Sequence, residues 1–125
     1  MRATASAPIA IIDDDESLCR SLGRVLRQAG FAPHTFLSAR DFLASPHRAQ
    51  LKCLLIDIQL GEVSGLDLHR QLRAEGDATP VIYITAHADP AVRREALDLG
   101  SAGFFLKTDA ASGIIELLRR VTQPA

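Results

Sequence analysis

The sequence predicts an α/β fold in which helices cover both faces of a parallel sheet. One observation supports this class, and a second supports a single domain. Short apolar runs alternate along the chain with segments whose apolar residues recur at helical spacing, which is typical of successive strand–helix units. The chain also has 125 residues and is 47% hydrophobic, which is enough for one domain with a buried core. We therefore expect residues 1–125 to form a single domain.

Five apolar runs predict the strands of the sheet. Most of them are apolar almost throughout, as strands that are buried on both faces usually are. We place them near residues 8–12, 31–36, 51–57, 80–84 and 102–106. Because a helical pattern follows every run, we expect five strand–helix units.

The first two helices have clear limits in the sequence. In the first, apolar residues recur at helical spacing from Leu18 and form one buried face, and Gly30 ends the helix. The second helix begins at Ser38, a good N-cap residue, and ends before Pro46.

The other three helices are predicted in the same way. The third begins near Ser64 and ends around Gly76, and the fourth begins at Asp89 and ends at Gly100. The fifth carries apolar residues at helical spacing between residues 114 and 121.

Composition argues against several classes of function. A formal net charge of -1 gives no reason to expect direct nucleic-acid binding. No apolar stretch reaches the roughly 18 residues that a membrane helix needs, and no signal peptide is recognisable, so we expect a cytoplasmic protein without membrane contact.

Cys19 and Cys53 lack metal-ligand spacing and are expected to be buried thiols. We expect His34, His47 and His69, which share no spacing, to be solvated.

Four of the predicted strands end at residues that can take part in chemistry. In open α/β sheets, ligands bind beyond the carboxyl ends of the strands. Carboxylates gathered at that edge repel one another unless a cation joins them. Each of these residues alone could simply cap a turn or a helix, so their shared position is what predicts a site. The residues are Asp13 and Asp14 after the first strand, Asp57 at the end of the third, Thr85 after the fourth and Lys107 after the fifth.

Five motifs in a fixed order then identify a family. They are Ile11-Ile12-Asp13-Asp14-Asp15-Glu16, Leu55-Ile56-Asp57, Ser64-Gly65-Leu66-Asp67-Leu68, Pro80-Val81-Ile82-Tyr83-Ile84-Thr85-Ala86 and Gly103-Phe104-Phe105-Leu106-Lys107. With these motifs the chain resembles bacterial response-regulator receiver domains over about residues 7–122, and especially the receivers of LuxR-type transcription factors. The resemblance implies a flavodoxin-like, doubly wound (βα)5 sandwich with the strand order 2-1-3-4-5.

The resemblance also implies a phosphorylation site that depends on a metal. Asp57 would accept the phosphoryl group, and Asp13, Asp14, Asp57 and the backbone carbonyl of Gln59 would hold Mg²⁺. A carboxylate oxygen is a competent nucleophile toward phosphorus, and Mg²⁺ prefers carboxylates, phosphate oxygens and water. The side chain of Gln59 would tune the lifetime of the acyl phosphate.

Other residues would bind the phosphoryl group and respond to it. Lys107 would supply positive charge, the Thr85 hydroxyl would donate a hydrogen bond, and the small Ala86 side chain would leave room. Thr85 and Phe104 would form the switch, and His87 would be a second tuning residue. Because a phenylalanine has no hydroxyl to keep in water, we expect Phe104 to lie at least partly inward before phosphorylation.

The family relationship implies partners as well. A sensor histidine kinase would donate the phosphoryl group, and phosphorylation could produce a homodimer through the fourth helix, fifth strand and fifth helix. The domain would catalyse only its own phosphorylation and dephosphorylation, so we do not expect an enzyme. We expect the output to be transcription, through an effector domain that is absent from this chain; the alternative is a stand-alone receiver.

Two positions depart from the family pattern. Receivers usually have a proline, joined by a cis peptide, after the lysine, and here Thr108 follows Lys107. We expect this bond to be cis despite a cost of roughly 3 kcal/mol, because the surrounding fold can over-determine a strained bond. Gly61 stands where a proline is common, so we expect residues 60–63 to be more mobile than usual.

Two other functions are alternatives to the receiver. A Mg²⁺-dependent phosphohydrolase with an aspartyl nucleophile would need an Asp-x-Asp motif, which Asp13 and Asp15 match, but also a longer core or a cap. A flavodoxin-like cofactor-binding module would have to place a phosphate beside the acidic first loop, which would repel it.

Overall fold

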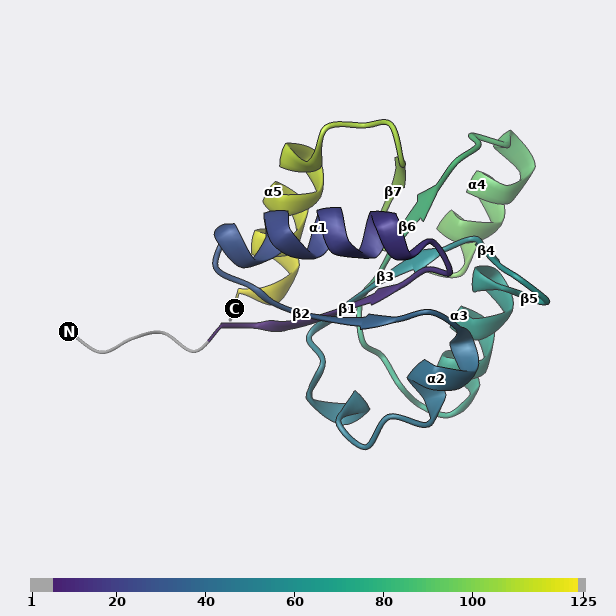
Figure 1. Ribbon diagram of the computed structural model, residues 1–125. Helices are drawn as coiled ribbons and strands as arrows, with labels where there is room; N and C mark the ends of the chain where they lie inside the picture. Colours follow the sequence, from purple (N-terminus) through teal and green to yellow (C-terminus); the bar gives the residue numbers. More distant parts are fainter. Residues whose placement is uncertain (1–5, 124–125) are drawn as a thin grey trace.

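A five-stranded parallel sheet forms the centre of the molecule in the computed structural model, which describes residues 6–123 (Figure 1). Its order, β2-β1-β3-β6-β7, is the predicted order 2-1-3-4-5, since β4 and β5 belong to a separate hairpin. The predicted strands are confirmed to within two residues. The five are β1 (Pro8–Ile12), β2 (Ala32–Phe36), β3 (Cys53–Asp57), β6 (Val81–Thr85) and β7 (Gly103–Leu106).

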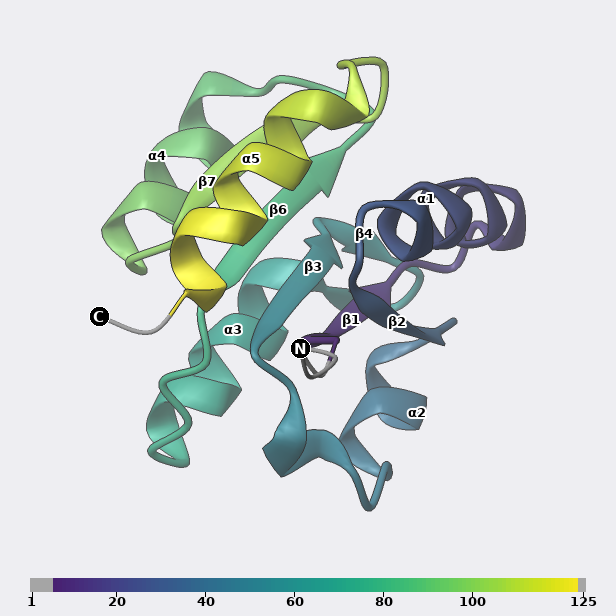
Figure 2. The ribbon, with the colours of Figure 1, turned by 90° about the vertical axis from the view of Figure 1, so that its left-hand side faces the viewer.

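Helices cover both faces of this sheet, as Figure 2 shows. α1 and α5 pack on one face through residues such as Leu26 and Leu118, while α2, α3 and α4 pack on the other through Phe42, Leu72 and Ala96. The two hydrophobic cores are therefore separated by the sheet, as in a doubly wound fold. The helices are α1 (Glu16–Gln28), α2 (Ala39–Leu43), α3 (Gly65–Ala74), α4 (Pro90–Asp98) and α5 (Ala111–Thr122), with a short 3-10 helix η1 (Arg48–Gln50).

The helix starts follow from local hydrogen bonds. Four helices begin after a residue whose side chain accepts a hydrogen bond from a backbone N–H in the first turn. These N-cap residues are Asp15, Ser38, Ser64 and Asp89. The predicted starts of α2, α3 and α4 are thus confirmed.

A small hairpin after β3 was not predicted. β4 (Gln59–Leu60) pairs antiparallel with β5 (Val63–Ser64), and the chain turns at residues 61–62. Gly61 has a φ of 74°, a left-handed conformation that a turn residue with a side chain would adopt only with strain. Strands of two residues are too short to show alternation in the sequence, so this hairpin had no recognisable signal.

Cys19 and Cys53 are buried, free thiols, as predicted, and burial raises the pKa of Cys19 to about 11. None of the described helices is long and apolar enough to cross a membrane.

The expectation that His69 is solvated was wrong. His69 is fully buried and its Nδ1 lies 2.6 Å from the hydroxyl of Tyr83. Its position explains this, because it stands three residues after Leu66 and three before Leu72, on the face of α3 that packs on the sheet. His34 and His47 are exposed, as predicted.

Burial makes the protonated form of His69 unfavourable. Burial first, then the positive charges of Arg73 and Arg70, lower the pKa of His69 to about 4 from 6.5. At neutral pH the imidazole is therefore uncharged.

This shift predicts how stability changes in acid. As the pH falls from 6.5 to about 4, the unfolded chain takes up a proton at His69 that the folded chain does not, so the free energy of unfolding decreases. The loss should approach about 3 kcal/mol. Denaturant unfolding of the parent and of His69→Gln across this range measures it, and the exposed His47→Gln is the control.

The comparison with a variant is necessary because another group acts in the opposite direction. Burial raises the pKa of Asp13 to about 6, so acid should stabilise the fold through that residue. A parent and His69→Gln whose unfolding free energies run parallel from pH 7 to 4 would contradict the assignment.

Candidate functional site

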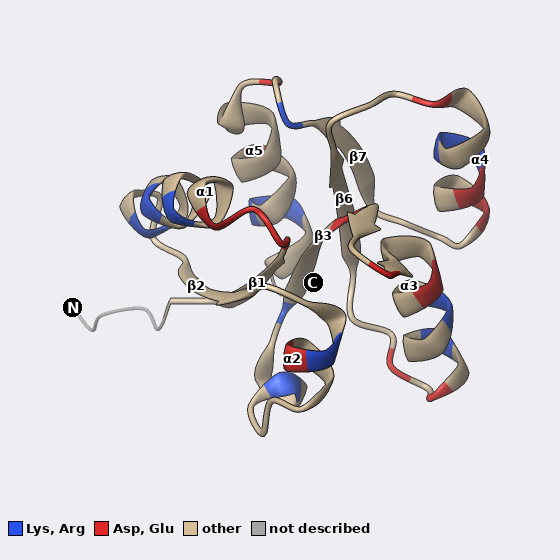
Figure 3. Cartoon of the chain, turned by 45° about the vertical axis from the view of Figure 1, so that its right-hand side comes forward, with Lys and Arg blue, Asp and Glu red and all other residues tan. Residues whose placement is uncertain are grey.

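The parallel sheet brings all four predicted strand ends to one edge of the molecule (Figure 3). Ile12 is in register with Ile56, so Asp13 and Asp57, the residues that follow them, leave the sheet side by side. Thr85 is in register with Leu106, which places Lys107 next to it. The neighbouring registers therefore assemble residues that lie far apart in the sequence.

Three carboxylates meet at this edge. Asp13 and Asp57 are 2% and 5% exposed, whereas Asp14 is exposed, and one oxygen from each lies within 4.8 Å of the others. Burial raises the pKa of Asp13 to about 6, and the charge of Asp57 acts in the same direction. Hydrogen bonds from the backbone N–H of Asp15 and from Lys107 oppose this rise.

The carboxylate cluster fits a hard divalent cation. Asp13 Oδ2 is buried and makes no hydrogen bond of good geometry among the described residues, although the Lys107 ammonium lies 3.0 Å away. Lys107 is shared with Asp57, so a cation bound by all three carboxylates would balance charge that one lysine leaves uncompensated. A set of carboxylate oxygens with one exposed member also suits Mg²⁺, which keeps several of its waters.

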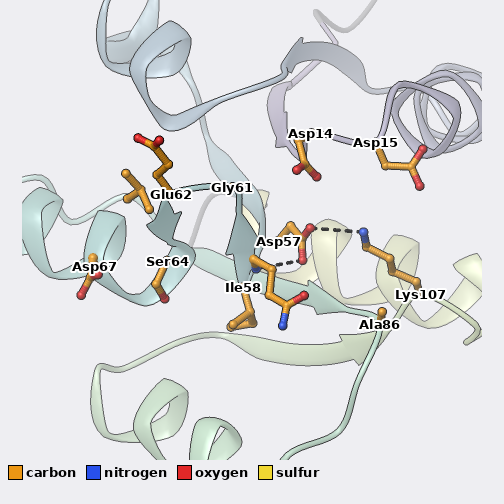
Figure 4. Close-up of a pocket in the computed structure, with 12 residues that line it drawn as sticks. Asp14, Asp15, Asp57, Ile58, Gly61, Glu62, Ser64, Asp67, Ala86 and Lys107 are labelled. Carbon is orange, nitrogen blue, oxygen red and sulfur yellow. Dashed lines mark hydrogen bonds and ion pairs between the residues drawn. The ribbon is translucent and has the colours of Figure 1, made fainter.

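Lys107 bridges the two buried carboxylates. Its Nζ lies 3.0 Å from Asp13 Oδ2 and 3.2 Å from Asp57 Oδ2, and Figure 4 shows it reaching toward Asp57 from the right, with Asp14 above Asp57. Burial works against the charged ammonium, but the hydrogen bonds and charges of Asp13 and Asp57 outweigh it and raise the pKa of Lys107. The lysine therefore stays protonated and offsets part of the repulsion between the carboxylates.

Asp57 faces an open cavity of about 710 Å³. Asp14, Ala86 and Lys107 contribute to its walls, and so does the hairpin between β3 and α3. The backbone N–H of Gln59 donates a hydrogen bond of 3.2 Å to Asp57 Oδ1, which fixes the orientation of the carboxylate. The side chain of Gln59 is exposed and lines the cavity.

Gly65 is a residue of the site for which no role was predicted from the sequence. A Cβ at this position would lie 2.2 Å from the backbone oxygen of Asp57, so only glycine allows α3 to start this close to the end of β3. Its N–H also donates to the backbone oxygen of Ile58. The signal for this role was the Ser-Gly pair in the third motif, but the distance that explains it exists only in the fold.

The other predicted residues take different positions. Thr85 is 4% exposed, and its hydroxyl accepts a hydrogen bond of 3.4 Å from the N–H of His87. Ala86 borders the cavity and His87 is exposed. Phe104 is partly buried, with its ring 6.4 Å from that of Tyr83. Its ring thus lies partly inward, as expected.

The expectation of a cis bond after Lys107 was wrong. The Lys107–Thr108 peptide is trans, which agrees with the intrinsic cost of a cis bond without proline. A different turn supports the lysine. Asp109 accepts a hydrogen bond of 2.9 Å from the N–H of Leu106, and its own N–H donates to the Leu106 carbonyl at 3.0 Å.

Comparison with known proteins assigns the family. Residues 9–119 match the response regulator receiver domain. The chain is a member of this family. This receiver is 36% identical over 99 residues to the response regulator protein TodT of Pseudomonas putida, which covers 79% of this chain and 44% of TodT. It is 34% identical over 114 residues to the transcriptional regulatory protein FixJ of Azorhizobium caulinodans, covering 91% of this chain and 54% of FixJ.

Solved structures confirm the fold of this receiver. The chemotaxis protein CheY4 of Vibrio cholerae superposes with a TM-score of 0.83 at 23% identity, covering 94% of this chain and 99% of CheY4. The receiver domain of the Francisella response regulator 1452 gives a TM-score of 0.86 at 19% identity, covering 94% and 97%. The chain spans about half the length of the curated relatives it matches. Family membership favours the receiver over the phosphohydrolase and cofactor-binding alternatives.

The cation site predicts a selective effect of Asp14. Mg²⁺ at about 100 times its Kd should stabilise the parent by about 3 kcal/mol, and Asp14→Asn should lose most of this gain while keeping the fold. Without metal the variant should be no less stable than the parent, because one repelling carboxylate is gone. Thermal melts with and without Mg²⁺ measure the stabilisation by the metal and the stability of each protein without it.

Asp15→Asn is the matched control for this measurement. It removes the same charge one residue further along, and asparagine can still cap α1 as Asp15 does. An Asp14→Asn protein that gains as much from Mg²⁺ as Asp15→Asn does would remove Asp14 from the site.

Proposed function

We propose that this receiver accepts a phosphoryl group on Asp57 from a sensor histidine kinase or a small phosphodonor, in a reaction that requires Mg²⁺. One observation carries the proposal. The buried Asp57 carboxylate opens onto a cavity, with the Lys107 ammonium 3.2 Å away and the carboxylates of Asp13 and Asp14 beside it. A nucleophile, a fixed cation and a set of metal ligands are thus collected at one point.

Each residue of the site would have a separate role in the transfer of the phosphoryl group. An Asp57 oxygen forms a bond to phosphorus while the bond between phosphorus and the donor breaks. Asp13, Asp14, Asp57 and the Gln59 carbonyl would hold Mg²⁺, which neutralises charge on the phosphoryl oxygens when bound. Lys107 then pairs with a phosphoryl oxygen in place of an Asp57 oxygen.

Other residues would respond to the bound phosphoryl group and affect its release. The Thr85 hydroxyl would give up its hydrogen bond with the N–H of His87 and donate to a phosphoryl oxygen. Ala86 leaves the cavity open there, and the exposed side chains of Gln59 and His87 would adjust how readily water reaches the acyl phosphate. The domain would modify only itself, so we propose that it is not an enzyme in the sense of turning over a substrate.

The proposed output is the control of transcription. FixJ is described as a transcriptional regulatory protein, and TodT as a response regulator protein. We propose that phosphorylation changes the surface formed by α4, β7 and α5 and promotes self-association there. Such a contact would cover Leu97 on α4, an apolar residue that is 58% exposed.

The phosphorylation site can be tested by intact mass. Incubation with Mg²⁺ and a small acyl phosphate should add one phosphoryl group to the parent and none to Asp57→Asn. Omitting Mg²⁺ should also prevent the addition. Equal modification of the parent and the variant would remove Asp57 from the role.

The surface change can be tested by sedimentation. Mg²⁺ with beryllofluoride, which mimics the phosphoryl group, should increase self-association of the parent. Thr85→Ala should reduce this response, because the hydroxyl that bonds the phosphoryl group is absent. A variant that binds the mimic and associates as the parent does would show that Thr85 does not carry the signal.

A further inference from the structure

A buried polar pair lies between α3 and β6, away from the phosphorylation cavity. His69 and Tyr83 are both 0% exposed, and the imidazole Nδ1 lies 2.6 Å from the tyrosine hydroxyl. Burial lowers the pKa of His69 to about 4 and raises the pKa of Tyr83, so both groups are uncharged at neutral pH. An apolar pair would fill the same space, but a hydrogen bond also fixes the direction of the two rings.

The tyrosine of this pair supports the ring of Phe104. Tyr83 and Phe104 are register partners in β6 and β7, and their ring centroids are 6.4 Å apart. The guanidinium of Arg93, on α4, lies 5.7 Å from the centre of the Phe104 ring. A continuous row of side chains therefore runs from α3 through the sheet residues to α4.

The α3 end of this row is connected to Asp57, the proposed phosphoacceptor. α3 starts at Gly65, which lies so close to the backbone of Asp57 that a Cβ would stand 2.2 Å from its oxygen. His69 follows four residues later, one helical turn along α3. Because packed helices move as units, a displacement of the Asp57 backbone would also displace His69.

We propose that His69 and Tyr83 are positioning residues of the switch, and that they form a route from Asp57 through α3 to Phe104 in addition to the route through Thr85. The inference rests on the proposed function, since it requires a modification at Asp57. The hydrogen bond keeps the Tyr83 ring directed at α3 and leaves Phe104 its partly inward position. Without His69, the buried hydroxyl has lost its partner, and the ring turns toward the partly exposed Phe104 to reach water.

The chain contains its own probe for this route. Tyr83 is its single tyrosine and it has no tryptophan, so tyrosine emission reports on this residue alone. Adding Mg²⁺ and beryllofluoride to the parent should change the emission. In His69→Leu most of this change should be lost, and mimic-induced association should weaken about fivefold, a typical size for coupling between sites.

Two matched variants separate positioning from simple packing. His69→Gln can still form a hydrogen bond with Tyr83 and should restore the emission change. His34→Leu makes the same substitution at an exposed histidine and should respond as the parent does. A His69→Leu protein with the parent's emission change and association would overturn the proposal.

A second measurement covers the case in which His69→Leu does not fold. In the unaltered protein, the nitrogen NMR signals of the His69 ring should shift when the mimic binds, and they should still shift in Thr85→Ala. Unchanged His69 signals in the parent would overturn the inference while leaving phosphorylation at Asp57 intact. Failure to modify Asp57 at all would instead overturn the proposed function, and this inference with it.

Discussion

The chemistry of this receiver depends on the repulsion between carboxylates that the sheet forces together. Asp13 and Asp57 are buried next to each other, and burial raises the pKa of Asp13, so its charge is more costly than it would be in water. Lys107 offsets part of this cost from 3.0 Å and 3.2 Å, and a divalent cation would offset more. A site that needs positive charge for stability would suit the proposed transfer of a phosphoryl group in the presence of Mg²⁺. The remaining structure can be understood as the means of holding this cluster in place.

Strong burial of the sheet makes that possible. The strands β1, β3 and β6 are buried almost throughout, because helices cover both of their faces. Rigid neighbouring strands keep a constant register, and constant register fixes how far apart the residues at their ends lie. The loops beyond these ends are less constrained. The site therefore combines precise positions at the sheet edge with an open side formed by the hairpin.

In the proposed switch, a change at the site has two ways to reach the surface. Thr85 lies at the end of β6, in register with β7, so it can act directly on the strand that carries Phe104. α3 provides the second way, because it begins against the Asp57 backbone and carries His69 to Tyr83. Both lead to Phe104, which packs against the core on the α3 and α4 face of the sheet.

Local patterns in the sequence determined the class of fold, the five strands and five helices and most of their limits, because apolar periodicity and capping residues act over a few neighbours. They also indicated the residues at the strand ends, together with the family motifs. Tertiary structure decided the rest. The trans bond after Lys107, the hairpin at Gly61 and the role of Gly65 depend on chain segments that meet only in the fold. So does the burial of His69, since its solvation depends on a partner, Tyr83, that lies 14 residues away and meets it only when α3 packs on the sheet.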